Sequence, residues 1–121
     1  MISTEELTRL IVEGIHDRKG RGVTVVDMSH IESAAAQRFI IAQGTSTMQV
    51  AAIADSVVEY VRTHTDPAVK PYNEDGAGNA EWIVIDYGNV WVHIFMPEAR
   101  VRYSLEDLWS DAVITDIPDL D

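Results

Sequence analysis

The chain has 121 residues, no cysteine and a net charge of −11 at pH 7. This length supports one compact domain with one hydrophobic core. The lack of cysteine excludes disulfides, thiolate metal sites and thiol nucleophiles, and it fits a reducing cytoplasm. The negative charge disfavours direct nucleic-acid contact and favours a basic protein partner, although it would equally keep a small domain soluble. We expect no membrane span, because no apolar run is long enough to cross a bilayer. We also expect no signal or transit peptide, because the first residues lack the basic-then-apolar order of a signal peptide and the arginine-rich bias of a transit peptide.

Two amphipathic helices are predicted from capping residues that are followed by apolar residues at helical spacing. The first begins at the Ser3–Glu6 capping box and runs to about Arg18. The second begins at the Ser46–Gln49 capping box and runs to about His64, where an Asp-Pro pair stops it. Each helix has one apolar stripe, so each is expected to pack one side against a sheet.

Two nearly continuous apolar runs, at residues 23–28 and 39–43, predict strands that are covered on both faces. The connector between them, residues 29–37, is expected to contain a short helical turn. Residues 69–79 contain glycine and proline and predict a loop, with a short strand around Val69–Lys70 as an alternative.

The stretch Glu81–Met96 predicts a β-hairpin, because Gly88–Asn89 is a two-residue turn signal between two β-branched and aromatic runs. If these two residues are the loop, the register places Trp82 opposite Phe95 and Asp86 opposite Trp91. Side chains alternate along a strand, so the hairpin has two surfaces, one of them almost wholly aliphatic. The other surface carries Trp82, Asp86, Trp91, His93 and Phe95. The residues leave two interpretations of this mixed surface open: a helix covers it, or it is an interface in which aromatic groups anchor a partner.

Beyond the hairpin, residues 97–100 lead into a predicted short helix at Tyr103–Trp109 with Ser104 as its N-cap. The residues after this helix include acids and no base, so we expect a domain at 1–112 and an extended or loose acidic tail at 113–121. The predicted fold class is α/β (α+β), a single domain with a mixed sheet of four to five strands and two long helices packed on it.

The main candidate for enzyme chemistry is the strand-to-helix turn Gly44–Ser46, whose free amides and helix dipole could hold a phosphate. It lacks the lysine of a phosphate-binding loop, and a nucleotidyltransferase would need two alternating strand aspartates where the hairpin offers Asp86 alone. The four histidines lack metal-ligand spacing, and His93 has a carboxylate only diagonally across the strand pair. We therefore predict no catalytic residue, cofactor or metal, and keep a nucleotide-binding enzyme of the nucleotidyltransferase type as the alternative.

A series of motifs runs in one order along most of the chain. It comprises Val26–Asp27, Phe39–Gly44, Ser46, Gln49–Val50, Ala52–Asp55, Glu81–Trp82, Asp86–Gly88, Val92–Phe95, Pro97–Glu98, Arg100, Tyr103, Leu105–Glu106, Leu108–Trp109 and Asp111–Ala112. This series resembles the Iojap family, the ribosomal silencing factors (RsfS). The chain departs from the family pattern at Gln37–Arg38, where an Asp-Tyr pair is usual, and at Arg102, where a tyrosine is usual.

The resemblance implies a fold similar to that of nucleotidyltransferases, without their metal-binding aspartates and without enzyme activity. It implies binding to the large ribosomal subunit through large-subunit ribosomal protein fourteen. The bound factor would block joining of the small subunit and repress translation when nutrients are limiting. A basic ribosomal protein as partner agrees with the net charge of −11.

On this hypothesis the mixed surface and the segment after it dock on the ribosomal protein. The predicted contact residues are Trp82, Asp86, Tyr87, His93, Phe95, Arg100 and Tyr103. Trp82 and Phe95 would be apolar anchors, Asp86 would pair with a basic side chain, and the other residues would orient the contact. A homodimer through the mixed surface is a third hypothesis, because small domains with an apolar patch often associate.

Overall fold

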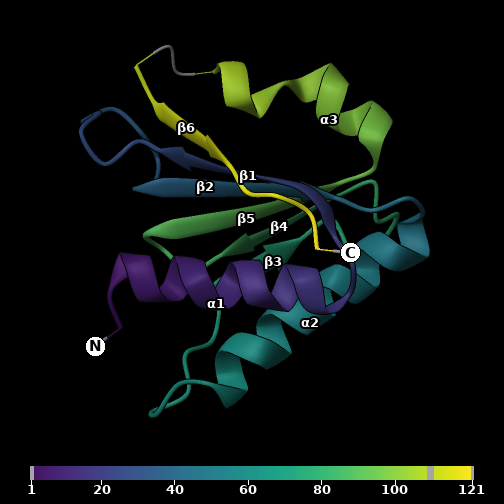
Figure 1. Ribbon diagram of the computed structural model, residues 1–121, viewed down its shortest axis with the longest axis horizontal. Helices are drawn as coiled ribbons and strands as arrows, with labels where there is room; N and C mark the ends of the chain where they lie inside the picture. Colours follow the sequence, from purple (N-terminus) through teal and green to yellow (C-terminus); the bar gives the residue numbers. More distant parts are fainter. Residues whose placement is uncertain (1, 109–110, 121) are drawn as a thin grey trace.

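The computed structural model of the chain describes residues 2–108 and 111–120 (Figure 1). Its elements in chain order are α1 (Thr4–Asp17), β1 (Arg21–Asp27), β2 (Arg38–Gln43), α2 (Thr47–Thr63), β3 (Asn73–Asp75), β4 (Trp82–Asp86), β5 (Val90–Phe95), α3 (Pro97–Tyr103), the 3-10 turn η1 (Leu105–Asp107) and β6 (Val113–Asp116). The strands form one sheet of six in the order β3-β4-β5-β2-β1-β6. Strands β2 and β5 are parallel, and the other neighbouring pairs are antiparallel.

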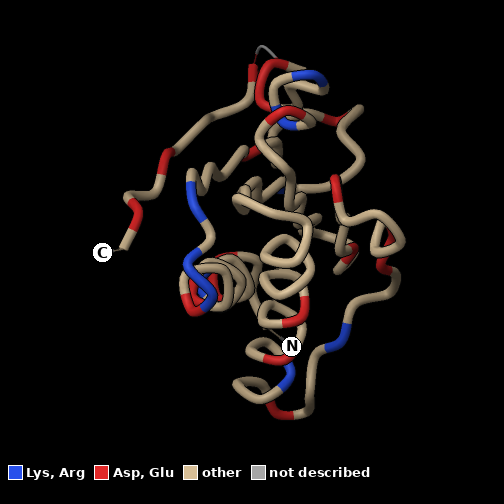
Figure 2. The backbone as a smooth tube through the Cα atoms, turned by 90° about the vertical axis from the view of Figure 1, so that its right-hand side faces the viewer, with Lys and Arg blue, Asp and Glu red and all other residues tan. Residues whose placement is uncertain are grey.

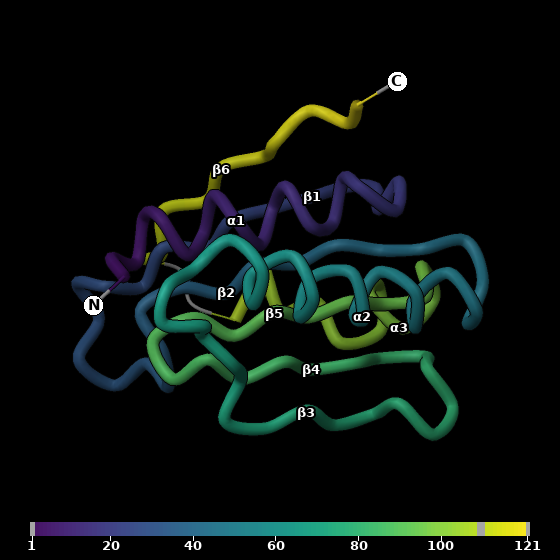
Figure 3. The backbone as a smooth tube through the Cα atoms, turned by 90° about the horizontal axis from the view of Figure 1, so that it is seen from below, coloured from purple at the N-terminus to yellow at the C-terminus, as the bar shows by residue number. Residues whose placement is uncertain are grey.

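The predicted α/β class with a mixed sheet is confirmed, but the sheet has six strands and not four to five. The strands that the sequence did not reveal, β3 and β6, lie on opposite edges of the sheet (Figure 3). Strand β3 forms at Asn73–Asp75 and not at Val69–Lys70. Both edge strands are short and exposed along their whole length, so neither has the apolar alternation that identifies a strand in a sequence.

Both long helices lie on the same face of the sheet (Figures 1 and 3). They pack closely on each other at Gly14, where an added Cβ would come 3.0 Å from the Cα of Val57. The Ser56 hydroxyl donates a hydrogen bond of 2.7 Å to the Gly14 carbonyl oxygen at the same crossing. The main core lies between these helices and the sheet, and its fully buried members include Leu10, Ile11, Ile15, Ile40, Ile53, Val57, Ile85, Val92 and Ile94.

Both predicted helix starts are confirmed. The hydroxyl of Ser3 accepts a hydrogen bond from the Glu6 backbone N–H, and the hydroxyl of Ser46 accepts one from the Gln49 backbone N–H, each at 3.1 Å. The Gln49 side chain also accepts from the backbone N–H of Thr45 at 2.7 Å. The Ser46 hydroxyl thus satisfies one of the free amides in the first turn of α2, which is the function of an N-cap.

The segment after the hairpin differs from the prediction. Helix α3 begins at Pro97, whose fixed φ suits the first turn of a helix. Ser104, predicted as an N-cap, has a φ of 45° and ends α3, and only the 3-10 turn η1 follows it. The predicted helix extended to Trp109, which lies outside the described residues.

The residues predicted to form an acidic tail continue the sheet. Strand β6 pairs antiparallel with β1, and the Ile117 backbone N–H then donates to the Val23 carbonyl oxygen at 2.8 Å. Asp119 accepts a hydrogen bond of 2.9 Å from the Gly22 backbone N–H. The boundary predicted after residue 112 therefore falls inside the domain, because backbone pairing does not require the apolar pattern that this segment lacks.

Candidate interaction face

The predicted register of the hairpin is confirmed, from Trp82 opposite Phe95 to Asp86 opposite Trp91. Gly88 has a φ of +89°, a conformation that glycine adopts without strain in a two-residue hairpin turn. The turn gives β4 and β5 the two different surfaces that were predicted. We call one of them the aromatic face, and it carries Trp82, Val84, Asp86, Trp91, His93 and Phe95.

Tyr87 lies on the opposite surface, under the two long helices. Its side chain is 5% exposed and belongs to the aliphatic core. Within the described residues its hydroxyl has no hydrogen-bond partner, and burial raises the pKa of Tyr87 well above its ordinary value. Tyr87 therefore does not share a surface with the other predicted contact residues.

His93 lies at the centre of the aromatic face. The indole Nε1–H of Trp82 donates to His93 Nδ1 at 3.1 Å, and the ring of Phe39 on β2 meets the imidazole edge-on with 4.5 Å between ring centroids. Only 3% of His93 is exposed, and burial lowers its pKa to about 4. A neutral and nearly inaccessible imidazole fixes the orientation of Trp82, but it offers no surface to a partner.

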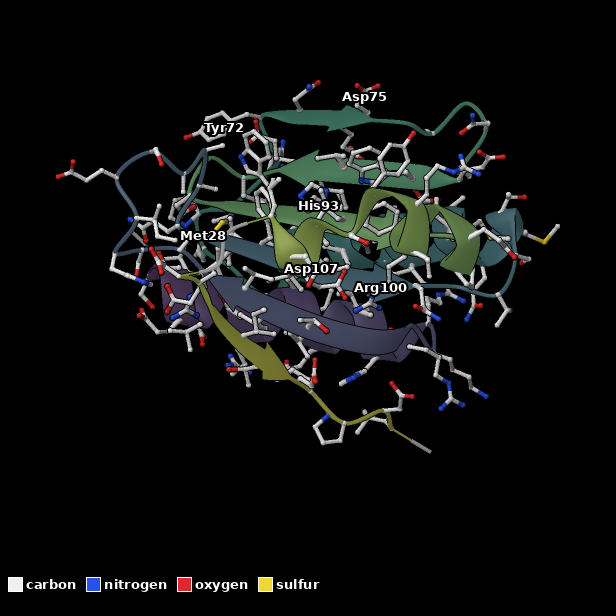
Figure 4. The ribbon with its side chains drawn as sticks, turned by 90° about the horizontal axis from the view of Figure 1, so that it is seen from above. Met28, Tyr72, Asp75, His93, Arg100 and Asp107 are labelled. Atoms are coloured by element: carbon white, nitrogen blue, oxygen red, sulfur yellow. The ribbon has the colours of Figure 1, made fainter. Side chains whose placement is uncertain are left out.

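Two segments cover parts of the aromatic face. Helix α3 lies across one end of it, over the fully buried Phe95, and contributes Ala99 to the same cluster (Figure 4). The connector 29–37 has turns and not the predicted helical turn, and it packs Ile31 and Ala34 against this second, smaller core. The sequence left open which surface of the hairpin is covered. In the structure, α1 and α2 cover the aliphatic surface fully, whereas α3 and the connector 29–37 cover the aromatic face only in part.

An open strip remains between these two covers. Trp82, Val84 and Trp91 are half-buried there, and Tyr103 at the end of α3 is 48% exposed. The Tyr103 and Trp82 rings lie 4.5 Å apart between centroids, and Trp91 stacks on Phe39 at 5.8 Å. We call Trp82, Val84, Trp91 and Tyr103 the aromatic strip. Such a strip offers large, rigid apolar groups whose positions are already fixed, which is the character of an anchoring surface.

Arg100 forms its hydrogen bonds inside the molecule (Figure 4). Its guanidinium donates to the Gly22 carbonyl oxygen at 2.6 Å, to Thr24 Oγ1 at 3.0 Å and to Gln43 Oε1 at 3.1 Å. It also pairs with Glu106 at 2.9 Å, and its side chain is mostly buried. Arg100 therefore fastens α3 to β1 and β2 and so positions Tyr103, whereas it was predicted to orient the contact directly.

Asp86 lies at the end of β4 that is farthest from α3. Its Oδ1 accepts a short hydrogen bond of 2.6 Å from the Gly88 backbone N–H, so the carboxylate helps to close the hairpin turn. Its side chain remains half-buried. Asp86 is thus on the aromatic face, as predicted, with one oxygen committed to the turn.

Four of the seven predicted contact residues lie in one cluster: Trp82, His93, Phe95 and Tyr103. The predicted contact residues do not include Trp91, and no pattern in the sequence associates Phe39 with this face. The signal for Phe39 is the parallel register of β2 and β5, which places it opposite Trp91. That register depends on strand order, and no local pattern in the sequence specifies it.

The parts of the alternative enzyme site lie apart. The backbone N–H of Gly44 bonds to the Phe95 carbonyl oxygen, at the end of the hairpin where Trp82 lies. Asp86 is at the other end of β4, about 13 Å further along the strand. Within residues 2–108 and 111–120, no group of three or more histidine, aspartate or glutamate side chains could hold a metal ion. In the same residues no helix combines the length and the apolar character that crossing a membrane requires.

Acidic side chains outnumber basic ones on the surface. The chain has 20 Asp and Glu residues against 9 Lys and Arg residues, and Figure 2 shows the acidic positions on both the helical and the sheet side of the molecule. The net field around the molecule is therefore negative and favours the approach of a basic protein surface.

Comparison with known proteins gives a consistent result. The family model described as ribosomal silencing factor during starvation matches residues 1–121. A ribosomal silencing factor from Halalkalibacterium halodurans is 36% identical over 111 residues, which cover 92% of this chain and 92% of that protein. The mouse protein named mitochondrial assembly of ribosomal large subunit protein 1 is 28% identical over 84% of this chain and 44% of its own length. A crystal structure of a Chromobacterium violaceum protein superposes with a TM-score of 0.81 at 33% identity, covering 89% of this chain and 87% of that one.

Proposed function

Because this chain belongs to the ribosomal silencing factor family, we propose that it binds the large ribosomal subunit and blocks joining of the small subunit, repressing translation when nutrients are limiting. The description of the family supports the response to starvation. The name of the mouse relative supports the large subunit as the partner. We place this activity in the cytoplasm and assign it to binding without catalysis.

The observation that carries the proposal is the aromatic strip, a preformed and partly exposed apolar surface on an acidic protein. We assign it to large-subunit ribosomal protein fourteen. Trp82 and Tyr103 are the anchors that contact the partner, and Asp86 supplies a charge for a basic side chain. A basic ribosomal protein would meet both the apolar strip and a favourable electric field.

The buried members of the predicted contact set act through these anchors. Phe95 and His93 hold the indole of Trp82, and Arg100 holds α3 and with it Tyr103. Tyr87 supports the hairpin turn from the helix-covered side. Substituting any of these four should weaken docking only as far as it displaces Trp82, Tyr103 or Asp86.

Co-sedimentation tests the proposal directly. The chain should pellet with isolated large subunits and stay in the supernatant with assembled ribosomes, whose joining surface is covered. Trp82→Ala should weaken the binding at least about tenfold while circular dichroism shows the fold intact. Met48→Ala is the matched control, because Met48 is 82% exposed at the start of α2 and lies outside the strip. Failure to pellet with large subunits at low salt would contradict the proposal.

A homodimer through the aromatic strip would compete with docking for the same residues. Equilibrium sedimentation of the chain alone distinguishes the two cases. A dimer that Trp82→Ala dissociates would mean that the strip is occupied until the ribosome displaces the second copy.

A further inference from the structure

The outer edge of β6 is a second surface that could bind a partner, because its outward backbone groups pair with no other strand in the described residues. Strand β6 ends the sheet next to β1, on the edge opposite β3 (Figure 3). It is three strands from β5, about 14 Å across the sheet. It is therefore separate from the aromatic strip and is not used by the proposed function.

The pairing with β1 determines which backbone groups of β6 are free. The Ile117 N–H donates to the Val23 carbonyl, so this pair is hydrogen-bonded, and hydrogen-bonded pairs alternate along an antiparallel ladder. By that alternation Val113 and Thr115 direct their backbone groups toward β1, whereas Ile114 and Asp116 direct theirs outward. In the described part of the chain, no other strand pairs with β6. The edge thus presents two N–H and two C=O groups to a further strand.

The side chains of β6 also suit strand pairing. Val113 is 58% exposed and Ile114 is 47% exposed, although both are β-branched residues that favour packed sheets. The ladder from 113 to 116 is regular, without a bulge, and the strand contains neither proline nor lysine. Bulges, prolines and lysines are among the features that protect exposed edges. Strand β6 has two other such features, its short length and the charged Asp116, so its edge is suited to a partner whose charge complements that acid.

Charge around this edge selects the kind of partner. A hollow of ≈ 680 Å³ beside β6 is lined by acids from η1 and from the C-terminal segment: Glu106, Asp107, Asp116 and Asp119. Glu106 pairs with Arg100, and Asp119 pairs with Arg21 at 3.3 Å. Asp107 and Asp116 belong to none of the ion pairs in the described structure, so the hollow keeps a net negative charge.

We propose that the edge of β6 binds an extended, lysine- or arginine-rich peptide segment as a seventh strand. The peptide backbone would pair with the outward groups of Ile114 and Asp116, and its apolar side chains would cover Val113 on the opposite face of the sheet from Asp116. Its basic side chains would lie over Asp116 and the acidic hollow. A second copy of this chain fits less well, because antiparallel pairing of two β6 strands would bring Asp111, Asp116 and Asp119 of both copies together.

Titration with a synthetic peptide tests the proposal. A fluorescent peptide of about seven residues, alternating lysine or arginine with valine, should bind the full chain and raise the peptide's anisotropy. Amide resonances of Ile114 and Asp116 should shift in NMR spectra, while those of Trp82 and Tyr103 remain unchanged. A peptide of the same pattern with glutamate in place of the basic residues should not bind.

Ile114→Pro is the decisive variant. Because the Ile114 N–H points outward, proline removes an edge donor without removing a bond to β1, and an edge strand tolerates it on that side. Binding should fall at least about tenfold, whereas Ile114→Ala, which keeps the N–H, should cost about twofold to threefold. Far-UV circular dichroism and large-subunit co-sedimentation should be unchanged in Ile114→Pro, which keeps this result separate from the proposed function. Equal binding by Ile114→Pro would overturn the proposal.

The charge requirement has its own control. Asp116→Asn keeps an acceptor for the Thr24 hydroxyl, which now donates to Asp116 Oδ1 at 2.9 Å, and should weaken the basic peptide about twofold to fivefold. Asp55→Asn makes the same charge change on α2, on the other face of the sheet, and should have no effect. A dimer of the chain alone that Ile114→Pro dissociates would assign the edge to a second copy and overturn the proposal.

Discussion

The two surfaces of β4 and β5 come from the same strands and yet have opposite character. On the helix-covered side, Ile83, Ile85, Val92 and Ile94 are almost completely buried under α1 and α2. On the aromatic face, only His93 and Phe95 are buried, and the residues between the two covers remain half-exposed. A sheet with one aliphatic and one aromatic side can thus use the first for stability and keep the second as a fixed, partly open surface.

The two surfaces of the hairpin are stabilised by different kinds of interaction. The aliphatic side depends on burial of apolar area, which has no directional requirement. The aromatic face depends on directed contacts: an indole–imidazole hydrogen bond, ring stacking and the guanidinium of Arg100 under α3. Directed contacts fix side-chain orientation, so substitutions on the aromatic face should affect orientation more than global stability.

Ile94→Ala should produce the largest loss of stability, because Ile94 is fully buried on the helix-covered side. Removing three carbon atoms from a packed core costs about 2–5 kcal/mol of unfolding free energy. Urea denaturation at pH 7, monitored by circular dichroism, measures this directly.

The control is Val84→Ala on the half-buried side of the neighbouring strand. Val84→Ala should lower the free energy of unfolding by about 1 kcal/mol. It removes one methylene fewer than Ile94→Ala, and that difference in size explains only about 0.8 kcal/mol of the difference between the two losses. Equal losses in the two variants would mean that the aromatic face is packed as tightly as the aliphatic one, and the comparison would fail.

Acid should destabilise the protein through His93 before the carboxylates titrate. The folded-state pKa of His93 is about 4, against an ordinary value of 6.5. The folded chain therefore binds fewer protons at this site than the unfolded chain between pH 6.5 and pH 4, so stability falls as pH falls through that window. The full shift corresponds to roughly 3 kcal/mol.

His93→Gln tests this cause, because the glutamine oxygen can still accept from Trp82 Nε1–H and does not titrate. Urea midpoints at pH 7 and pH 5 should differ clearly in the wild type and by much less in the variant. The carboxylates with lowered pKa, among them Asp27 and Glu13, lose their stabilising effect only at lower pH. An unchanged pH dependence in His93→Gln would refute the role of the imidazole.

Arg100→Met should have an intermediate effect of about 1–3 kcal/mol, because it leaves the Glu106 carboxylate and the Gly22 carbonyl without their donor. Hydrogen exchange should accelerate in α3 while the amides of α1 and α2 keep their protection. Arg100→Lys keeps the charge but cannot reproduce the forked donors, so most of the loss should remain. Full recovery in Arg100→Lys would show that charge alone holds α3.

The predictable part of this structure was encoded locally. The caps at Ser3 and Ser46, the Gly88 turn and the hairpin register follow from residues within a few positions of one another, and they are confirmed. The N-cap predicted at Ser104 is wrong. The family and the mixed α/β fold were also predictable, because the family motifs extend along most of the chain.

The remainder depended on contacts between distant segments. Nothing near Arg100 in the sequence indicates that its partners are Gly22, Thr24 and Gln43. Strand β6 has no apolar pattern of its own, and it forms because β1 offers a free edge. The burial of Tyr87 and His93 likewise depends on the elements that cover each side of the hairpin.

Tyr103→Ala should have the smallest effect on stability and a distinct effect on docking. Tyr103 is 48% exposed and contacts Trp82, so its removal should cost about 0.5–1.5 kcal/mol, the range of a single aromatic pair. Co-sedimentation with large subunits should weaken about tenfold, because Tyr103 is one of the two proposed anchors. Tyr103→Leu separates the two effects, since leucine keeps apolar contact with Trp82 but loses the planar ring. If Tyr103→Ala reduced stability as much as Ile94→Ala and left docking intact, Tyr103 would belong to the core, and the open surface would shrink to Trp82, Val84 and Trp91.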